Sequence, residues 1–341
     1  MKPNLFNYAT SELSQDAVLC WLAAWCSPDH AAHDPLLHEL GKQFIRAAFV
    51  ACSTPHPADV FSVRVDRQYR NIDIVVRINE TIALCIEDKA GSTEHSGQLD
   101  RYLEAMRQEE NPPELILPVY IQTYNQNCYQ GVEASGYKVF SRRDLISVLA
   151  SYADAGGTNA IALDFLEHLQ SLEAWFESFR TLDPKLWKDA GPWQGFFGEL
   201  KQHLNKGDWD YVPNPAGGFW AYTWGWKEVG ASSIYLQLEE GLLTCRIWPS
   251  QDADRRYERD KWSGRFIESA NKAGLPFVKP PKFRSGSSMR VAQLADDYRV
   301  TDGNGRIDLR ATTEVLARTE IVLADAARAY SEAVAAEPTE V

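Results

Sequence analysis

Hydrophobic residues in the first half of the chain follow helical spacing in some segments and strand spacing in others. Apolar residues recur every three or four positions through 11–25 and 34–52, which predicts two helices. Other segments predict a strand over 60–65, a helix over 92–107, a strand over 115–122 broken by Pro118, a strand over 137–140 and a helix over 143–152. Helices interleaved with strands in this order predict a mixed sheet flanked by helices, an α/β core.

A hairpin is predicted at the centre of this core, over residues 71–89. Two runs rich in Ile, Val and Leu flank the turn residues Asn79-Glu80. Asp73 lies near the start of the first run, and Glu87 and Lys89 lie near the end of the second. An antiparallel hairpin brings all three residues to one end of the sheet. Because Glu87 and Lys89 are two positions apart, their side chains point to the same face.

The second half of the chain begins with helical patterns and continues with strand patterns. Helices are predicted over 161–181 and 190–205, and a terminal helix over 311–335 precedes a frayed tail at 337–341. Alternating segments predict strands over 218–226, 233–239 and 242–248. We therefore expect a first domain over 1–155, a helical connector over 156–206 and a strand-rich, antiparallel α+β domain over 207–341.

Composition is that of a globular protein. The chain has 341 residues, 45% of them hydrophobic and 24% charged, which is enough for two domains with ordinary cores. Its six cysteines form no Cys-x-x-Cys pair, so we expect reduced thiols and neither a disulfide framework nor a zinc site. The first residues lack the apolar run of a signal peptide. These features predict a cytoplasmic protein that does not engage membranes.

The chemistry of Asp73, Glu87 and Lys89 suits a metal-assisted reaction. Two carboxylates are hard oxygen donors for Mg²⁺, which binds one or two such groups and keeps several waters. A lysine beside the ion can orient a water or stabilise charge on a phosphate. The arrangement fits phosphodiester hydrolysis. The alternative is a salt-bridged pair at a solvated strand end, although charges in apolar strands require a reason.

Three patches of the sequence resemble the PD-(D/E)xK nuclease superfamily, which includes many restriction and repair nucleases. Asp73 followed by Glu87-Asp88-Lys89 matches its central motif, with Ile72-Asp73 in place of Pro-Asp. Residues 94–102 contain Gln98-Leu-x-x-Tyr102, similar to the helix after the core strands in one bacterial branch. Residues 6–16 resemble the opening helix of that branch, whose glutamate corresponds to Glu12. Together the patches span about the first third of the chain.

The resemblance implies a restriction-endonuclease-like core and a nuclease dependent on Mg²⁺ or Mn²⁺. It implies that Asp73, Glu87 and the main-chain carbonyl of Asp88 are metal ligands and that Lys89 positions the attacking water. Glu12 would be a further metal ligand or a remote orienter. Gln98 and Tyr102 would support the substrate phosphate or the lysine. The expected substrate is DNA, with RNA not distinguished, in bacterial defence or DNA processing. The second domain would select substrate, sense a trigger or mediate assembly, for example as a homodimer.

Charge bears on where nucleic acid would lie. A net charge of −12 argues against non-specific coating of nucleic acid, but a cleft needs only local positive charge. Arg64, Arg67 and Arg70 flank Asp73 and are the first candidates for phosphate contacts, with Arg77 nearby. Residues 252–290 hold ten basic and five acidic residues with interleaved aromatics. That run predicts either a track for nucleic acid or a helix with a solvated basic face and an aromatic core stripe.

Other candidate features are weaker. Seven tryptophans between Trp187 and Trp248 suit either a ligand-binding wall or core packing of a small sheet. His30, His33 and His38 lack the spacing of a metal site. The sequence therefore predicts a metal-dependent deoxyribonuclease. The alternative hypothesis is a nuclease-fold module that binds nucleic acid or acts as a sensor, with hydrolysis weak or lost, because fold alone does not settle function.

Overall fold

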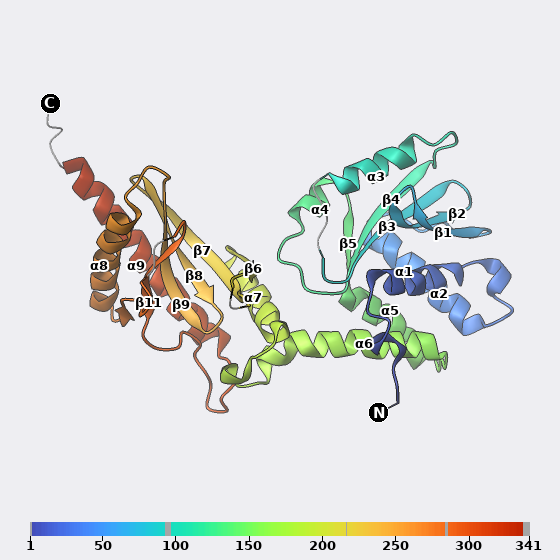
Figure 1. Cartoon of the computed structure of the whole chain (residues 1–341). Coiled ribbons are helices and arrows are strands. Elements are labelled where there is room, and N and C mark those ends of the chain that lie inside the picture. The colour runs from blue at the N-terminus through green and yellow to red at the C-terminus, as the bar shows by residue number, and fades with distance from the viewer. Residues whose placement is uncertain (1, 93–96, 216, 284–285, 337–341) are drawn as a thin grey trace. The chain divides into compact units, whose positions relative to one another are not determined.

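A computed structural model describes residues 2–92, 97–215, 217–283 and 286–336. The chain divides into two compact units, Met1–Trp175 and Phe176–Val341 (Figure 1). The predicted fold class, a mixed α/β core followed by an antiparallel α+β region, is confirmed. No helix in the described part of the chain is long and apolar enough to cross a membrane.

The first unit is built on a five-stranded mixed sheet of order β1-β2-β3-β4-β5. Strands β1, β2 and β3 pair antiparallel, whereas β3, β4 and β5 are parallel. The strands are β1 (Val63–Tyr69), β2 (Ile72–Ile78), β3 (Ile82–Lys89), β4 (Leu115–Gln122) and β5 (Lys138–Ser141). The helices are α1 (Glu12–Ala24), α2 (Pro35–Ala51), α3 (Gln98–Arg107), α4 (Gln130–Ala134), α5 (Arg142–Asp154) and α6 (Ala160–Glu177).

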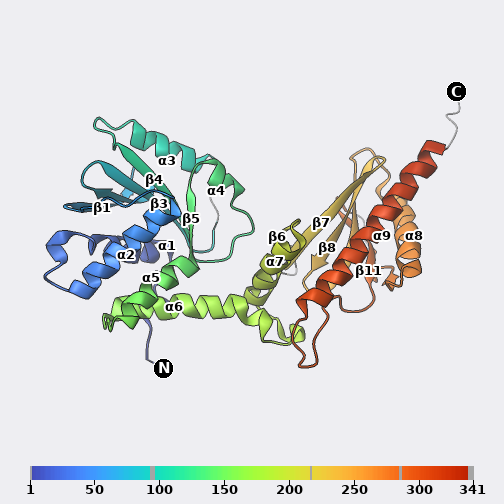
Figure 2. The ribbon, with the colours of Figure 1, turned by 180° about the vertical axis from the view of Figure 1, so that it is seen from behind.

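Helices cover both faces of this sheet (Figures 1 and 2). One face packs with α1, α2, α5 and α6 in a single apolar cluster that includes Phe44, Ile74 and Phe165. The other face packs with α3 and α4 through smaller clusters that include Leu103 and Met106. Period-2 alternation in β2 and β3 therefore sends successive side chains toward different helices.

Local sequence explains where the first elements begin and turn. Ser11 caps α1 by accepting a hydrogen bond from the Ser14 main-chain N–H at 3.2 Å, as Ser and Thr caps commonly do. The predicted hairpin forms between β2 and β3, and Asn79 and Glu80 in its turn have φ of 52° and 60°. Asn tolerates such left-handed conformations better than most residues, which favours a turn here.

Two predictions for this unit need correction or restriction. Pro118 does not break its strand, because β4 runs without interruption from Leu115 to Gln122. Pairing of β4 with β5 begins only at Val119, so the missing N–H of Pro118 lies beside an unpaired edge, where proline is tolerated. The helix predicted over 92–107 is described from Gln98 onward, and residues 93–96 lie outside the described residues.

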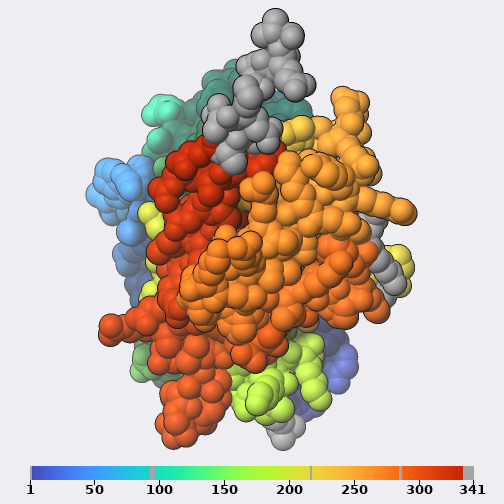
Figure 3. Space-filling model, turned by 90° about the vertical axis from the view of Figure 1, so that its left-hand side faces the viewer, coloured from blue at the N-terminus to red at the C-terminus, as the bar shows by residue number. Residues whose placement is uncertain are grey.

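The second unit holds an antiparallel sheet of order β10-β11-β9-β8-β7-β6. Its strands are β6 (Asp208–Val212), β7 (Phe219–Val229), β8 (Ser232–Glu239), β9 (Leu242–Pro249), β10 (Phe277–Val278) and β11 (Met289–Leu294). Its helices are α7 (Ala190–Leu204), α8 (Arg255–Lys272) and α9 (Leu309–Ala336). Short 3₁₀ helices in the chain are η1 (Leu5–Asn7), η2 (Pro28–His30), η3 (Ser178–Arg180) and η4 (Pro184–Leu186). Figure 3 shows α8 and α9 side by side on this unit.

The predicted connector over 156–206 contributes to both cores. Phe165 and Leu169 of α6 are buried in the first unit, whereas Trp193 and Phe197 of α7 are buried in the second. Most of the clustered tryptophans also pack in the second core, although Trp226 and Trp248 are about half exposed, at 48% and 51%. The tail at 337–341 lies outside the described residues.

Candidate active site

The β2–β3 hairpin brings Asp73, Glu87 and Lys89 to one end of the sheet. Ile74 pairs with Ile86, so the next residues outward, Asp73 and Glu87, are neighbours across the two strands. The main-chain N–H of Asp88 donates to Oδ2 of Asp73 at 3.0 Å. Gln68, near the end of β1, donates from Nε2 to Oδ1 of Asp73 at 2.9 Å. Both oxygens of Asp73 therefore have defined partners.

Lys89 and Glu87 form an ion pair within this cluster. Nζ of Lys89 lies 2.6 Å from Oε1 of Glu87, and the Glu87 side chain has no exposed surface. Helix α3 contributes Gln98, whose Nε2 donates to Oε1 of Glu87 at 2.9 Å and to the Tyr102 hydroxyl at 2.7 Å. The structure thus brings together five of the residues that the sequence marked as candidates.

Electrostatics at Glu87 are unfavourable for a bare carboxylate. Burial and then the charge of Asp73 raise the pKa of Glu87 to about 7, although Lys89 opposes this shift. Burial acts to lower the pKa of Lys89, but its hydrogen bond to Glu87 and the charges of Glu87 and Asp73 raise the pKa overall. Oε2 of Glu87 is buried without a hydrogen-bond partner. Such an oxygen is a natural site for a proton or a cation.

The chemistry of these donors fits a hard divalent cation. In the described part of the chain, no group of three or more His, Cys, Asp or Glu side chains is arranged to hold a metal ion. Mg²⁺ needs only one or two carboxylates when waters complete its shell. Asp73 and Glu87, joined by the carbonyl of Asp88, would supply such a set, and the unpartnered Oε2 of Glu87 would face the ion's charge.

Glu12 lies beside the end of β3 and holds the chain there. Its Oε1 accepts hydrogen bonds from the Ala90 main-chain N–H at 3.2 Å and from the Ser92 hydroxyl at 2.5 Å. The charge of Glu12 also contributes to raising the pKa of Lys89. In this structure Glu12 fixes the segment that follows Lys89, a contact that the sequence did not predict.

The opposite face of β3 carries a second buried polar group. The Asp88 carboxylate points toward α1, where Nε2 of Gln15 donates to its Oδ1 at 2.6 Å. Burial raises the pKa of Asp88 well above its usual range, and burial together with the charge of Asp73 raises the pKa of Asp16 to about 6. Oδ1 of Asp16 and Oδ2 of Asp88 are buried without hydrogen-bond partners. Sequence reasoning assigned no role to Gln15 or Asp16.

The candidate phosphate-binding arginines have differing surroundings. Arg64 pairs with Asp66 at 3.3 Å, and Arg70 donates to the Ala105 carbonyl at 2.8 Å. Arg67 is exposed, and its charge acts to lower the pKa of Asp16. Arg77 is buried and pairs with Glu109 at 2.6 Å, so its charge is already matched within the fold.

The described part of the basic run in the second unit comprises helix α8, the short strand β10, the first residues of β11 and the segments between them. Trp262 and Phe266 of α8 are fully buried in the core, as the alternative of an aromatic core stripe predicted. Cζ of Arg259 lies 3.8 Å from the centroid of the Phe283 ring, and Nζ of Lys279 lies 4.3 Å from the same centroid. These cations therefore already contact an aromatic face of their own chain.

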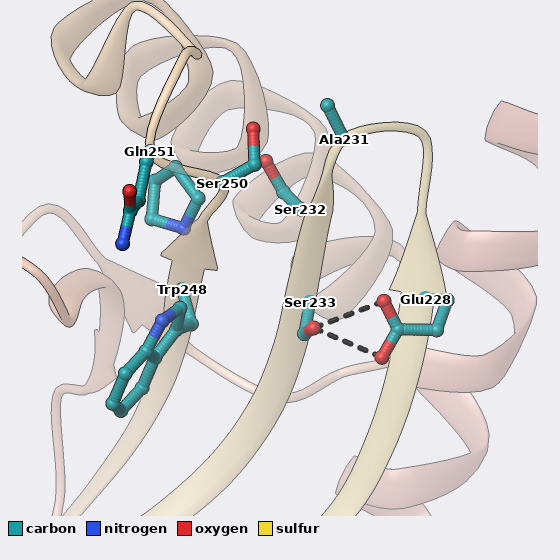
Figure 4. A pocket seen from close by; sticks show the side chains of 8 residues that line it. Glu228, Ala231, Ser232, Ser233, Trp248, Ser250 and Gln251 are labelled. Carbon is teal, nitrogen blue, oxygen red and sulfur yellow. Dashed lines mark hydrogen bonds between the residues drawn. The ribbon is translucent and has the colours of Figure 1, made fainter.

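A separate hollow of about 330 Å³ lies at one end of the second sheet. In it the Ser233 hydroxyl donates to both oxygens of Glu228, at 2.9 Å and 3.0 Å, and Trp248 lies on the other side of Ser233 (Figure 4). None of the residues that line it belongs to the set around Asp73. The cluster around Asp73 and this hollow therefore lie in different units of the chain.

Comparison with known proteins agrees with the geometry. Residues 3–171 match a family model described as the PD-(D/E)XK nuclease superfamily. No curated protein and no solved structure matches the chain. The match covers the first sheet, helices α1 to α5, the first two thirds of α6 and the whole cluster around Asp73, Glu87 and Lys89. The N-terminal unit of this chain belongs to the PD-(D/E)XK nuclease superfamily.

Proposed function

We propose that this protein is a metal-dependent nuclease that hydrolyses phosphodiester bonds of DNA. The observation that carries the proposal is the cluster at the end of the hairpin. A lysine lies 2.6 Å from a fully buried glutamate whose second oxygen has no partner, beside an aspartate held by two donors. A structural ion pair would not need the second carboxylate or the unpartnered oxygen.

Each side chain has a role that its surroundings support. Asp73 and Glu87, with the carbonyl of Asp88, would hold Mg²⁺ or Mn²⁺, which when bound would supply charge for the phosphate and the attacking water. Lys89 would orient that water or stabilise developing charge, since its pKa is raised and it remains a cation at neutral pH. Gln98 links Glu87 to Tyr102 and would steady the phosphate or the lysine.

Helix α1 and strand β1 would complete the site. Glu12 would complete the metal shell or act as a remote orienter through its hold on the segment after Lys89. Arg64, Arg67 and Arg70 of β1 and the turn that follows it would contact phosphates of the nucleic acid. We infer a cytoplasmic role in bacterial defence or DNA processing, with 1–155 as the nuclease-like domain, 156–206 as a connector and 207–341 as a domain for substrate choice, sensing or homodimer assembly.

The test is incubation of the pure protein with supercoiled plasmid, linear duplex DNA and RNA over a range of Mg²⁺ and Mn²⁺ concentrations. Cleavage that requires the metal and disappears in Asp73→Asn supports the proposal, and the preferred substrate distinguishes DNA from RNA. If DNA is bound but not cut under any condition, the protein is instead a nuclease-fold binding or sensor module. Activity that persists in Asp73→Asn would point to a contaminating enzyme.

A further inference from the structure

The buried side chain of Gln15 in α1 forms hydrogen bonds to β3 and to the segment just after β4, on the face of the sheet opposite to Glu87 and Lys89. Gln15 is 8% exposed, and both the nitrogen and the oxygen of its side-chain amide form hydrogen bonds. Its Nε2 donates to Oδ1 of Asp88 in β3 at 2.6 Å, and its Oε1 accepts from the Thr123 hydroxyl, just after β4, at 3.1 Å. Asp88 and Thr123 are each 1% exposed, so all three residues are removed from water.

The Asp88 carboxylate depends on this donor. A buried carboxylate without hydrogen bonds is strongly disfavoured, and its other oxygen, Oδ2, has no partner. The Gln15 amide therefore holds the Asp88 side chain from the α1 side of the sheet.

The main chain at Asp88 in turn orients Asp73. Its N–H donates to Oδ2 of Asp73 at 3.0 Å, on the strand edge beside β2. Because strand side chains alternate between faces, Gln15 acts from the face opposite to Glu87 and Lys89. Its hydrogen bonds reach none of the side chains to which the reaction is assigned, so its influence on them passes through Asp88.

We propose that Gln15 is a positioning residue for the candidate metal site. It anchors Asp88 from behind the sheet, so that the Asp88 N–H holds the Asp73 carboxylate and the Asp88 carbonyl keeps its place beside it. The part that concerns metal rests on the proposed function, whereas the anchoring of the Asp88 main chain does not. Partners that orient metal ligands in this way commonly change metal affinity when they are removed.

The test separates hydrogen bonding from volume. Gln15→Met keeps the length of the side chain but removes both hydrogen bonds, and Thr123→Val removes only the support of Gln15. Gln43→Ala is the control, because Gln43 of α2 accepts its hydrogen bond from Ser151 of α5 and not from β3 or the segment after β4. Two quantities are measured: amide exchange of Asp88 by NMR in the metal-free protein, and Mn²⁺ affinity by calorimetry.

We expect Gln15→Met to speed exchange of the Asp88 amide at least about tenfold and to raise the Kd for Mn²⁺ by roughly 10- to 100-fold. Thr123→Val should move both quantities in the same direction by less, and Gln43→Ala should move neither. A lower melting temperature in Gln15→Met with unchanged exchange at Asp88 and unchanged Kd would overturn the proposal. If the parent protein itself binds no Mn²⁺, the proposed function fails, and amide exchange alone decides the anchoring role.

Discussion

Lys89 and Glu87 point to the same face of β3 and form an ion pair at 2.6 Å, while the second oxygen of Glu87 stays buried without a partner. The Lys89 ammonium therefore contacts only one of the two carboxylate oxygens of Glu87. A proton, or a cation shared with the neighbouring Asp73 carboxylate, would give the other oxygen a partner, and this supports the proposal that the pair belongs to a reactive site.

Replacing the lysine should separate catalysis from binding. We expect Lys89→Ala to lower cleavage by roughly 10²-fold or more, because a general base or charge stabiliser is removed. Folding and metal binding should change little, as measured by circular dichroism and calorimetry. Lys138→Ala, at an exposed position of β5, is the control. Unchanged cleavage in pure Lys89→Ala removes this residue from the mechanism.

Neutralising either carboxylate should weaken metal binding. Asp73→Asn and Glu87→Gln replace a hard anionic donor by an amide, which is a poorer ligand for Mg²⁺ or Mn²⁺. Both changes also relieve repulsion between neighbouring like charges, so the melting temperature of the metal-free protein should rise. If both variants bind Mn²⁺ as the parent does, the metal is held elsewhere.

The raised pKa of Glu87 predicts how stability depends on pH. Its pKa is about 7 in the folded protein and 4.5 ordinarily, so between these values the folded state binds more protons than the unfolded state. Stability contributed by Glu87 is therefore greatest at low pH and falls as pH rises from about 4.5 to about 7.

The measurement is urea unfolding of the metal-free protein below and above this pH window, with Glu87→Gln compared on both sides of it. The difference in unfolding free energy between parent and variant should favour the variant more at the higher pH. A difference that is independent of pH would mean that Glu87 titrates normally in the folded protein.

Salt dependence can place the nucleic acid on one unit or the other. If arginines of β1 bind phosphates, Arg64→Gln with Arg67→Gln should weaken duplex binding and flatten the salt slope by about 0.9 for each phosphate that is no longer neutralised. The matched pair Lys279→Gln and Lys282→Gln tests the second unit. We expect the larger effect from the first pair. A slope that changes only with the second pair would place DNA on the C-terminal unit.

Close packing of α2 against the end of α1 predicts a stability effect at Gly41. A Cβ at Gly41 would lie 2.5 Å from the main-chain N of Cys26, so alanine forces backbone atoms apart. We expect Gly41→Ala to lower the unfolding free energy by about 1–3 kcal/mol in urea titrations. Gly264→Ala in α8 is the control, since nothing lies within 4 Å of its added Cβ. It should be neutral or stabilise by about 0.5–1 kcal/mol.

Local pattern was sufficient to predict the hairpin and the meeting of Asp73, Glu87 and Lys89, because both depend on strand period and a short turn. It also predicted most helices, because the apolar residues of a helix recur every three or four positions along the sequence. It did not predict that Gln15 holds Asp88 or that Glu12 caps the segment after Lys89, since these contacts join residues 73 or more positions apart. The three-residue and four-residue spacing of Glu12, Gln15 and Asp16 along one helix was the available indication.

The prediction that Pro118 breaks its strand was wrong for a related reason. A proline is excluded from a strand only where its N–H is needed, and that depends on which neighbouring strand is present at that position. The pairing of β4 with β5 begins one residue later, at Val119, a fact of register that a single segment does not contain.

The separation of these contacts along the chain has a consequence for how the protein matures. Asp73 and Glu87 lie in one hairpin with a short turn, so loop closure for their encounter is inexpensive and early in folding. The hydrogen bond from Thr123 to Gln15 joins residues 108 positions apart, so it requires a much longer segment of the chain to be brought together. A partly folded chain would therefore bring the two carboxylates together before the Gln15 contact, which we propose aligns them, has formed.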